Sequence, residues 1–273
     1  MIKKSGVIGH PICHTLSPVL HGHWIEQNNV SGQYDAYDVS PDALGDFVAN
    51  AKKDMVGFNV TVPHKNAIVA YCDTVSELAK LVGAVNTIVI KDGMVYGDNT
   101  DVFGFVTALL ENVKNKNKTL LKNKAVIFGA GGACRAGIIA LKKLGFENII
   151  IVNRTYEKAV KLAKEFGVDA VDMQDVGLAL ENATLLANTS IAGMNGDNII
   201  DIDMSSMHSD AVVYDIVYKP LYTDMLGRAV AQNLCAVTGI DMLLYQAVSG
   251  FEKWFGVAPV VDDCLRNKVL NKG

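Results

Sequence analysis

The sequence lacks the features that several classes of protein require. Its 25 lysines and arginines stand against 29 acidic residues, a net charge of −4, so no basic field recruits nucleic acid or an anionic membrane. Its five cysteines show no C-x-x-C spacing, which argues against a disulfide framework and a structural zinc site and favours a reducing cytoplasm. The first ten residues, MIKKSGVIGH, hold no sustained apolar run, so we expect neither a signal peptide nor a membrane span.

What the sequence does contain is a regular alternation of strand and helix patterns. Half of its 273 residues are hydrophobic, enough for a substantial core, and there is no internal repeat. The alternation predicts an α/β fold. We expect strands at 5–12, 34–39, 55–62, 125–128, 148–155, 185–190 and within 211–223. We expect helices at 17–28, 41–52, 63–80 and 239–256, and a turn at Asp92-Gly93 between two extended segments of 84–101.

The composition changes at residues 111–124, ENVKNKNKTLLKNK, which are rich in lysine and asparagine. No aromatic residues interleave with these lysines, so a solvated connection between domains is favoured over a nucleic-acid patch. We therefore expect two domains: residues 1–105 with 241–273, and residues 106–240. They are expected to be separated by a cleft and to close over it to exclude water.

A glycine turn follows the strand at 125–128. GAGGACRAG (129–137) enters a helix, and a strand, a glycine turn and a helix together make a phosphate site. Cys134 stands where the dinucleotide fingerprint usually has its third glycine, so the turn alone is a moderate signal. The residues predicted to contact a nucleotide here are Gly129, Ala130, Gly131, Gly132 and Ala133.

The next strand indicates which dinucleotide the turn suits. It ends in Asn153-Arg154-Thr155, where a site for NAD would place an acidic residue on the ribose. The planar fork of Arg154 suits a 2′-phosphate instead, which favours NADP, although an ordinary surface arginine is the simpler alternative. A later strand ends in Asn188, and we expect the following Thr189 and Ser190 to lie at the nucleotide crevice.

The first domain carries polar residues at several predicted strand ends, as ligand-binding residues do at the edge of a sheet. Each has a structural alternative: Ser17 could cap a helix, Asp101 could be a helix N-cap, and a lysine such as Lys65 is usually solvated. His21 and His23 are two apart on a predicted helix and point to different faces, so we expect no metal site. The candidates are Thr15, Ser17, Asn59, Thr61, Lys65, Asn86, Thr87, Asp98, Asn99 and Asp101.

These motifs together resemble the shikimate dehydrogenases over nearly the whole chain. GHPICHTLSPVLH and NVTVPHK are similar to the family's substrate and lysine motifs, and GAVNT and GDNTDVFGF to its asparagine and aspartate motifs. GAGGACRA with NRT is similar to its NADP site, and DIVYKPLYT and MLLYQAVSGFEKW to its closing segments. The resemblance implies reversible NADPH-dependent reduction of 3-dehydroshikimate to shikimate in aromatic amino-acid biosynthesis, on an N-terminal α/β substrate domain and a C-terminal Rossmann-type NADP-binding domain.

Carried over by position, the resemblance implies a role for each matching residue. Lys65 and Asp101 become the catalytic pair, and Gly239 joins the cofactor residues. Either of the pair could move the proton; we favour Lys65, because a lysine is mostly protonated at neutral pH. The substrate carboxylate would be held by Thr15, Ser17 and Tyr218, and the ring hydroxyls by Asn59, Thr61, Asn86 and Gln246.

Three departures and three rivals remain. Thr15 stands where the family most often has serine, which could shift preference toward quinate; Gly22 and Cys134 also depart from the pattern. A quinate/shikimate dehydrogenase using NAD or NADP is the first rival, a non-catalytic nucleotide-binding regulator the second and a methyltransferase the third. We expect shikimate or 3-dehydroshikimate as the small-molecule partner, with no nucleic acid and no membrane, and a homodimer is compatible with the sequence.

Overall fold

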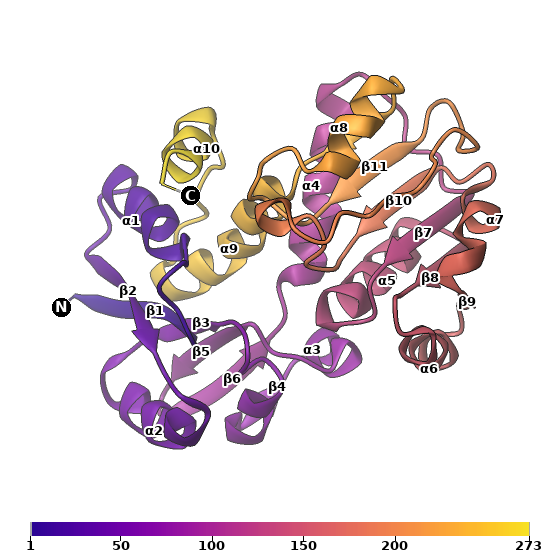
Figure 1. The fold of residues 1–273 in the computed structure, drawn as a ribbon. Helices are drawn as coiled ribbons and strands as arrows, with labels where there is room; N and C mark the ends of the chain where they lie inside the picture. Colours follow the sequence, from indigo (N-terminus) through magenta and orange to yellow (C-terminus); the bar gives the residue numbers. More distant parts are fainter. Residues whose placement is uncertain (1, 273) are drawn as a thin grey trace. The chain divides into compact units, whose positions relative to one another are not determined.

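The computed structural model describes residues 2–272. The chain divides into two units: the first runs to Thr100 and resumes at Leu244, and the second spans Asp101–Leu243. Each unit is built around its own six-stranded sheet (Figure 1). The α/β fold class predicted from the alternation of patterns is therefore confirmed.

The first unit has a mixed sheet with the strand order β2-β1-β3-β5-β6-β4. β1 runs parallel to both of its neighbours, whereas β5 runs antiparallel to β3 and β6. Its strands are β1 (Lys3–Gly9), β2 (Gly32–Asp38), β3 (Gly57–Val60), β4 (Thr74–Val75), β5 (Thr87–Lys91) and β6 (Met94–Asp98).

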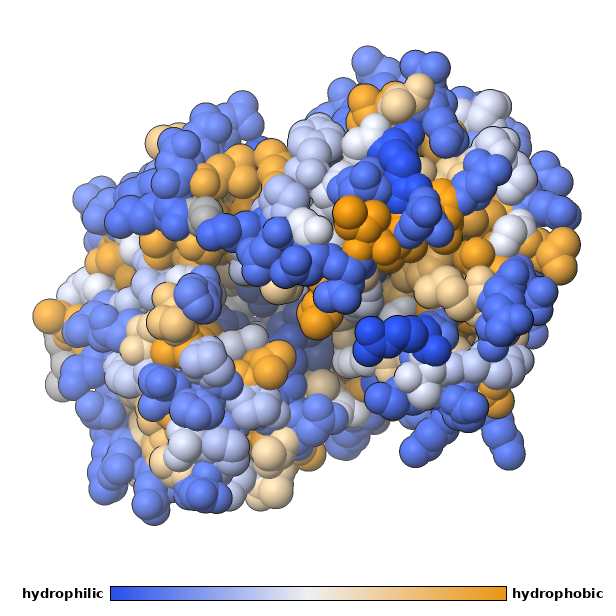
Figure 2. Space-filling view, viewed as in Figure 1, coloured by the Kyte–Doolittle hydropathy of each residue, from blue (hydrophilic) through white to orange (hydrophobic). Residues whose placement is uncertain are grey.

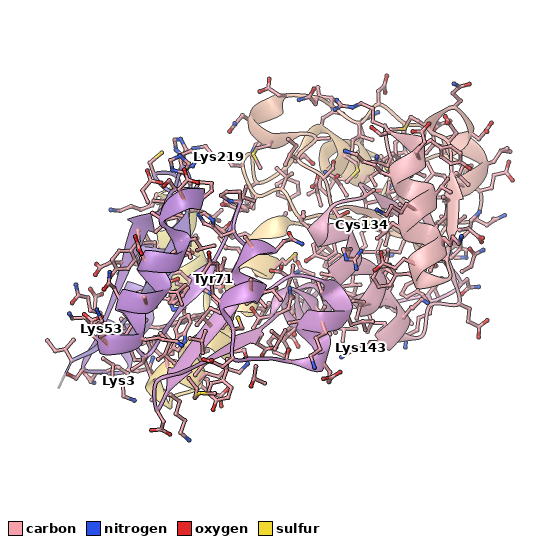
Figure 3. All side chains as sticks on the ribbon, turned by 90° about the horizontal axis from the view of Figure 1, so that it is seen from below. Lys3, Lys53, Tyr71, Cys134, Lys143 and Lys219 are labelled. Carbon is pink, nitrogen blue, oxygen red and sulfur yellow. The ribbon has the colours of Figure 1, made fainter. Side chains whose placement is uncertain are left out.

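Helices cover both faces of this sheet. On one face Phe58 and Val60 pack into a core with α2 (Leu44–Asp54), the 3₁₀ turn η2 (Ala67–Tyr71) and α3 (Glu77–Val82). Tyr71, labelled in Figure 3, lies against Gly45 of α2. On the other face lie α1 (Ser17–Gln27), α10 (Asp263–Leu270) and the part of α9 (Gly239–Phe255) that belongs to this unit.

The prediction of a single helix over residues 63–80 is wrong. The segment forms η2, the short strand β4 and α3 instead. Thr74 pairs with Tyr96 of β6, a partner remote in sequence, and β-branched residues suit such a pairing. The Ser76 side chain then caps α3 by accepting from Ala79 N at 3.1 Å. The strand expected at 55–62 also ends early: Val60 is buried but Val62 is 70% exposed, so the alternation stops at Val60.

The second unit has an all-parallel sheet with the strand order β12-β11-β10-β7-β8-β9. This is the doubly wound order of the Rossmann fold, and its direction reverses between β7 and β10. The strands are β7 (Lys124–Phe128), β8 (Asn148–Val152), β9 (Asp169–Val171), β10 (Leu185–Asn188), β11 (Val212–Asp215) and β12 (Cys235–Val237).

Alternate strand residues of this sheet feed two cores, one on each face. Val126, Phe128 and Leu186 pack toward α7 (Val176–Leu180) and α8 (Asp224–Ala231). The opposite face carries α4 (Asp101–Asn115), α5 (Gly132–Leu144) and α6 (Tyr156–Phe166). Hydrophilic residues predominate on the face shown in Figure 2, with patches of hydrophobic residues between them.

The lysine-rich segment 111–124 does not have the form expected from its composition. Its first five residues continue α4 to Asn115, and the whole segment lies inside the second unit. Asn112 Nδ2 donates to Asp241 Oδ2 at 2.8 Å, and the Lys116 ammonium donates to the Ala236 carbonyl. Hydrogen bonds from polar side chains therefore hold this segment against the second unit. The low apolar content of the segment could not predict these contacts. No described helix is long and apolar enough to cross a membrane.

Candidate active site

The glycine turn lies at the carboxyl end of β7. Gly129 has φ +109°, and a Cβ there would lie 2.9 Å from Thr189 Oγ1, so the turn packs closely on the residues that follow β10. A side chain at Gly131 or Gly132 would meet no atom within 4 Å. Gly131 is the N-cap of α5 and supplies no capping side chain. The N–H groups that open this helix therefore adjoin open space and can bind an anion.

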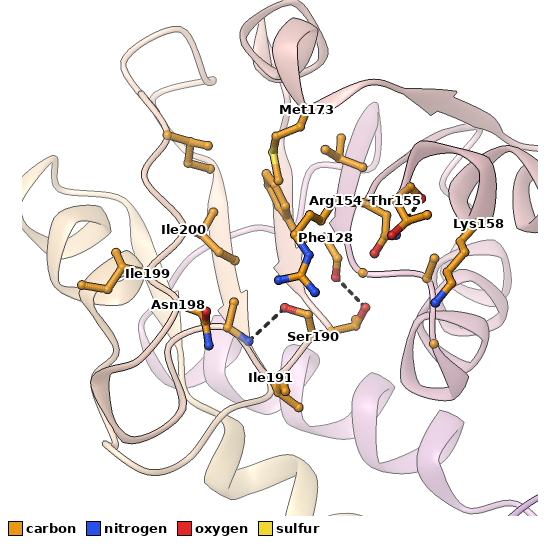
Figure 4. Close-up of a pocket in the computed structure, with 18 of the residues that line it drawn as sticks. Phe128, Arg154, Thr155, Lys158, Met173, Ser190, Ile191, Asn198, Ile199 and Ile200 are labelled. Atoms are coloured by element: carbon orange, nitrogen blue, oxygen red, sulfur yellow. Dashed lines mark hydrogen bonds between the residues drawn. The ribbon is translucent and has the colours of Figure 1, made fainter.

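A pocket of about 870 Å³ lies beside this turn, at the carboxyl edge of β7, β8 and β10 (Figure 4). The sheet order reverses at this edge, where doubly wound folds bind their ligands. The predicted cofactor residues that line it are Gly129, Ala130, Gly131, Asn153, Arg154, Thr155, Thr189 and Ser190. Gly132 and Ala133 belong to the first turn of α5 and are not part of the lining.

Two cationic side chains line the pocket on its β8 side. Figure 4 shows the Arg154 guanidinium pointing into the pocket, with Thr155 and Lys158 to one side of it. Neither Arg154 nor Lys158 has an ion-pair partner within residues 2–272. The acidic lining residue Asp201 is paired with Arg228 at 2.8 Å. The pocket therefore presents uncompensated positive charge, as an anionic ligand requires.

Sequence reasoning missed Lys158. It stands in the first turn of α6, where the helix dipole disfavours a cation. A lysine in such a position suggests that it binds an anionic ligand, and this was the signal available in the sequence. The reasoning also missed the apolar side of the pocket. Met173, Ile199 and Ile200 line it, and Ile191 is 72% exposed beside them. These side chains offer a flat aromatic ring an apolar surface.

A buried carboxylate organises the ends of β10 and β11. Asp215 accepts hydrogen bonds from Asn188 Nδ2 at 2.9 Å, Val217 N at 2.9 Å and Thr223 Oγ1 at 2.7 Å. Asn188 Oδ1 in turn accepts from Ser190 Oγ at 2.7 Å, which fixes a pocket-lining residue. Burial raises the pKa of Asp215 to about 6, although all three donors oppose the rise.

The first unit contains a polar network that joins several of the predicted substrate residues. We call Asn59, Asn86, Thr87, Thr100 and Gln246 the asparagine network. Asn86 Oδ1 accepts from Thr100 N at 2.9 Å and Thr87 Oγ1 at 3.0 Å, and Asn86 Nδ2 donates to Gln246 Oε1 at 3.4 Å. Asn59 Nδ2 joins it by donating to Thr87 Oγ1 at 3.3 Å. Residues from β3, the β5 edge and α9 therefore form one hydrogen-bonded array.

Thr15 and Ser17 lie together at the start of α1. Thr15 Oγ1 is 3.2 Å from Ser17 Oγ and accepts from Ser17 N at 3.3 Å. The N-cap of α1 is Leu16, so Ser17 does not have the capping role considered from the sequence, whereas the Thr15 hydroxyl binds the first N–H of the helix. Both residues are half-buried.

The other predicted residues lie as follows. Thr61 follows β3, and Lys65 is half-buried in the turn behind it. Asp101 is the first residue of α4. Tyr218 follows β11, where burial raises the pKa of its hydroxyl. Gly239 opens α9 outside the pocket lining, and a Cβ there would lie 2.2 Å from the Ile216 carbonyl oxygen.

The structure also identifies polar residues that the sequence did not single out. Thr100 and Tyr34 are buried, and each bonds to a predicted substrate residue. Their partners are remote in sequence, so no local pattern could reveal them. His21 and His23 are both buried, and no group of His, Cys, Asp and Glu within residues 2–272 could hold a metal ion.

The fold and the pocket together define a class of protein. A doubly wound parallel sheet with a glycine turn at its switch point and cationic side chains after the neighbouring strand β8 is the architecture of a dinucleotide-binding α/β protein. Two family models match the chain: "Shikimate dehydrogenase substrate binding domain" over residues 7–88 and "Shikimate / quinate 5-dehydrogenase" over residues 111–217. The chain belongs to the shikimate dehydrogenase family.

Individual relatives agree along the full length. The shikimate dehydrogenase (NADP(+)) of Rhizobium meliloti is 44% identical over 99% of this chain and 95% of its own. The crystal structure of shikimate 5-dehydrogenase from Thermus thermophilus, in complex with NADP(H) and shikimate, has a TM-score of 0.87 at 34% identity, covering 99% of both chains. A quinate dehydrogenase from Corynebacterium glutamicum in complex with NAD has a TM-score of 0.90 at 28% identity, covering 99% of this chain and 100% of that one.

Proposed function

We propose that this protein catalyses the reversible NADPH-dependent reduction of 3-dehydroshikimate to shikimate, a step of aromatic amino-acid biosynthesis. The relatives of about 40% identity along the whole chain are shikimate dehydrogenases of the NADP type. The observation that carries the cofactor choice is the pair of unpaired cations, Arg154 and Lys158, at the pocket beside the glycine turn. An NAD-specific site would have an acidic residue at the end of β8, and none stands there.

The residues present fit NADP. The open N-terminus of α5 suits the pyrophosphate, and the apolar side chains suit the adenine. Arg154 would bind the 2′-phosphate through its planar fork, and Lys158 would add a second charge. When bound, NADPH supplies the hydride for the ketone. The proposed cofactor residues are Gly129, Ala130, Gly131, Gly132, Ala133, Asn153, Arg154, Thr155, Lys158, Thr189, Ser190 and Gly239.

Lys65 and Asp101 are proposed as the catalytic pair. Reduction of a ketone forms an alkoxide, which needs a proton from a positioned acid. Lys65 would donate that proton from its ammonium and recover it in the reverse direction, while Asp101 holds the ammonium in orientation. The half-buried position of Lys65, in a turn held by the hydrogen bond from Val85 N to its carbonyl, supports this assignment.

The remaining predicted residues would bind the substrate. Thr15 and Ser17, with Tyr218, are proposed to hold its carboxylate through hydroxyl groups. Asn59, Asn86 and Gln246, with Thr61, are proposed to bind its ring hydroxyls. The asparagine network supports this proposal, because it holds three amide side chains in set orientations and so reduces the ordering cost of binding.

The two units would divide the work of the enzyme between them. The unit that contains Lys65 would be the substrate domain and the other unit the NADP domain. All five cysteines are free, which supports a cytoplasmic location. The homodimer stays a prediction, and sedimentation equilibrium of the purified protein tests it.

A steady-state assay tests the proposed reaction. Purified protein is followed by NADPH absorbance with shikimate and with quinate, using NADP and then NAD. We expect turnover of shikimate with NADP at the highest kcat/KM of the four combinations. The best rate with quinate and NAD would establish the rival enzyme instead. No turnover of either substrate, together with tight NADP binding, would establish a non-catalytic nucleotide-binding regulator.

A further inference from the structure

Tyr34 connects two strands of the first unit through a buried hydroxyl. It lies on β2 and is 7% exposed, and its Oη donates to Asn59 Oδ1 on β3 at 2.7 Å. β1 lies between these two strands, so the tyrosine side chain reaches across it. Ser5 is the register partner of Tyr34 on β1. The small side chain at that position leaves room for the ring to cross.

This hydrogen bond decides how the Asn59 amide is oriented. Asn59 Nδ2 donates to the Asn86 carbonyl at 3.2 Å and to Thr87 Oγ1 at 3.3 Å, so both of its N–H groups are used within the protein. Oδ1 accepts from Tyr34 and keeps one lone pair. Asn59 therefore has an acceptor, and no donor, to offer a hydroxyl group of a ligand.

The Tyr34 ring is itself held firmly by neighbours on α1 and α9. His21 stacks on it with ring centroids 3.9 Å apart and planes 8° from parallel, and the Trp254 ring lies 6.0 Å away. Burial lowers the pKa of His21 to about 3, so this partner stays an uncharged ring at neutral pH. Burial raises the pKa of Tyr34, and an interaction with Ser17 opposes that rise. The phenol therefore contacts Asn59, one of the proposed substrate residues.

We propose that Tyr34 is a positioning residue of the substrate site: its hydroxyl fixes Asn59 as a hydrogen-bond acceptor for a substrate hydroxyl, and it acts on the reaction through Asn59. This inference rests on the function proposed above. Without the phenol, the Asn59 amide could rotate and present a donor where the substrate requires an acceptor. The ring of phenylalanine would keep the stacking on His21 and remove the hydroxyl alone.

The test compares Tyr34→Phe with Tyr37→Phe. Tyr37 is three residues along β2, lies over Gly6 and packs on the opposite core, so its hydroxyl is a matched control. In Tyr34→Phe we expect kcat/KM for shikimate to fall roughly ten-fold, the scale of one buried hydrogen bond, while the KM for NADP stays unchanged. Tyr37→Phe should retain the wild-type values of both constants.

A double-mutant cycle with Asn59→Ala separates positioning from general structure. In the Asn59→Ala background, Tyr34→Phe should cause no further loss of kcat/KM for shikimate, because the Asn59 amide through which Tyr34 acts is already absent. An equal loss in both backgrounds, wild-type kinetics in Tyr34→Phe, or loss of its cooperative thermal transition would each overturn the inference. If the wild-type protein fails to turn over shikimate, the proposed function falls and this inference falls with it. Full wild-type activity alongside an unaffected Tyr34→Phe overturns the inference alone.

Discussion

Replacing Asp215 by asparagine should change how the stability of the protein depends on pH. The carboxyl group is 1% exposed, and burial raises its pKa from the ordinary value of 3.8 to about 6. The folded protein therefore binds this proton more tightly than the unfolded chain does. The associated stability is fully present below pH 3.8 and is lost as the pH rises through about 6. This shift corresponds to about 3 kcal/mol at roughly 1.4 kcal/mol per pH unit.

Asp215→Asn removes the titration and leaves an amide of the same shape. Urea denaturation from pH 4 to 7 should show the free energy of unfolding of the variant, relative to wild type, rising by roughly 2.4 kcal/mol across this range, because the rest of the difference develops below pH 4. Any change in hydrogen bonding to Thr223 or Asn188 would add an offset that is constant with pH. Asp203→Asn is the control: hydrogen bonds from Ser205 lower the pKa of Asp203, so its difference from wild type should drift the opposite way. Parallel curves for wild type and Asp215→Asn would refute the reasoning.

Three further predictions concern the cofactor pocket, the catalytic lysine and the packing of two glycines. Arg154→Ala and Lys158→Ala should each raise the KM for NADP roughly ten-fold or more and change the KM for NAD little, as steady-state kinetics will show; equal effects on both cofactors would contradict a 2′-phosphate contact. Lys65→Ala should lower kcat about 10²- to 10⁴-fold in the same assay, and near-native turnover would reject its role as the acid. Gly239→Ala should destabilise the protein by about 1–3 kcal/mol in urea melts, because its Cβ would lie 2.2 Å from the Ile216 carbonyl oxygen. Gly227→Ala, with no atom within 4 Å, should stabilise α8 by roughly 0.5–1 kcal/mol, and equal effects of the two would contradict the steric argument.

The elements that were predicted well have local signals. The strand at 125–128 and the helix after it are defined by an apolar run and a glycine turn, and β7 and α5 occupy those positions. Helix 63–80 failed because β4 exists only through its pairing with β6, a contact that no window of the sequence contains. The continuation of α4 to Asn115 was missed for a related reason, since its polar residues bond to remote partners such as Asp241.

The pocket residues also divide into those with a local sequence signal and those without one. Arg154 was found because it stands at a fixed place after the second strand of a βαβ unit. Met173 and Ile200 were not found, because loops of unpredictable path carry them to the pocket. Tyr34 and Thr100 were missed because a buried hydroxyl has no sequence signature; its role depends on which acceptor the fold brings within reach.

The most direct test of the account is a crystal structure of the protein with NADP and shikimate bound. The account predicts that Lys65 Nζ and the Asp101 carboxylate lie within about 3 Å of the ring hydroxyl that becomes the ketone, with the nicotinamide against the same carbon. It would be contradicted by a complex in which either side chain lies away from that hydroxyl, or in which NADP binds outside the pocket that Gly129, Arg154 and Ser190 line.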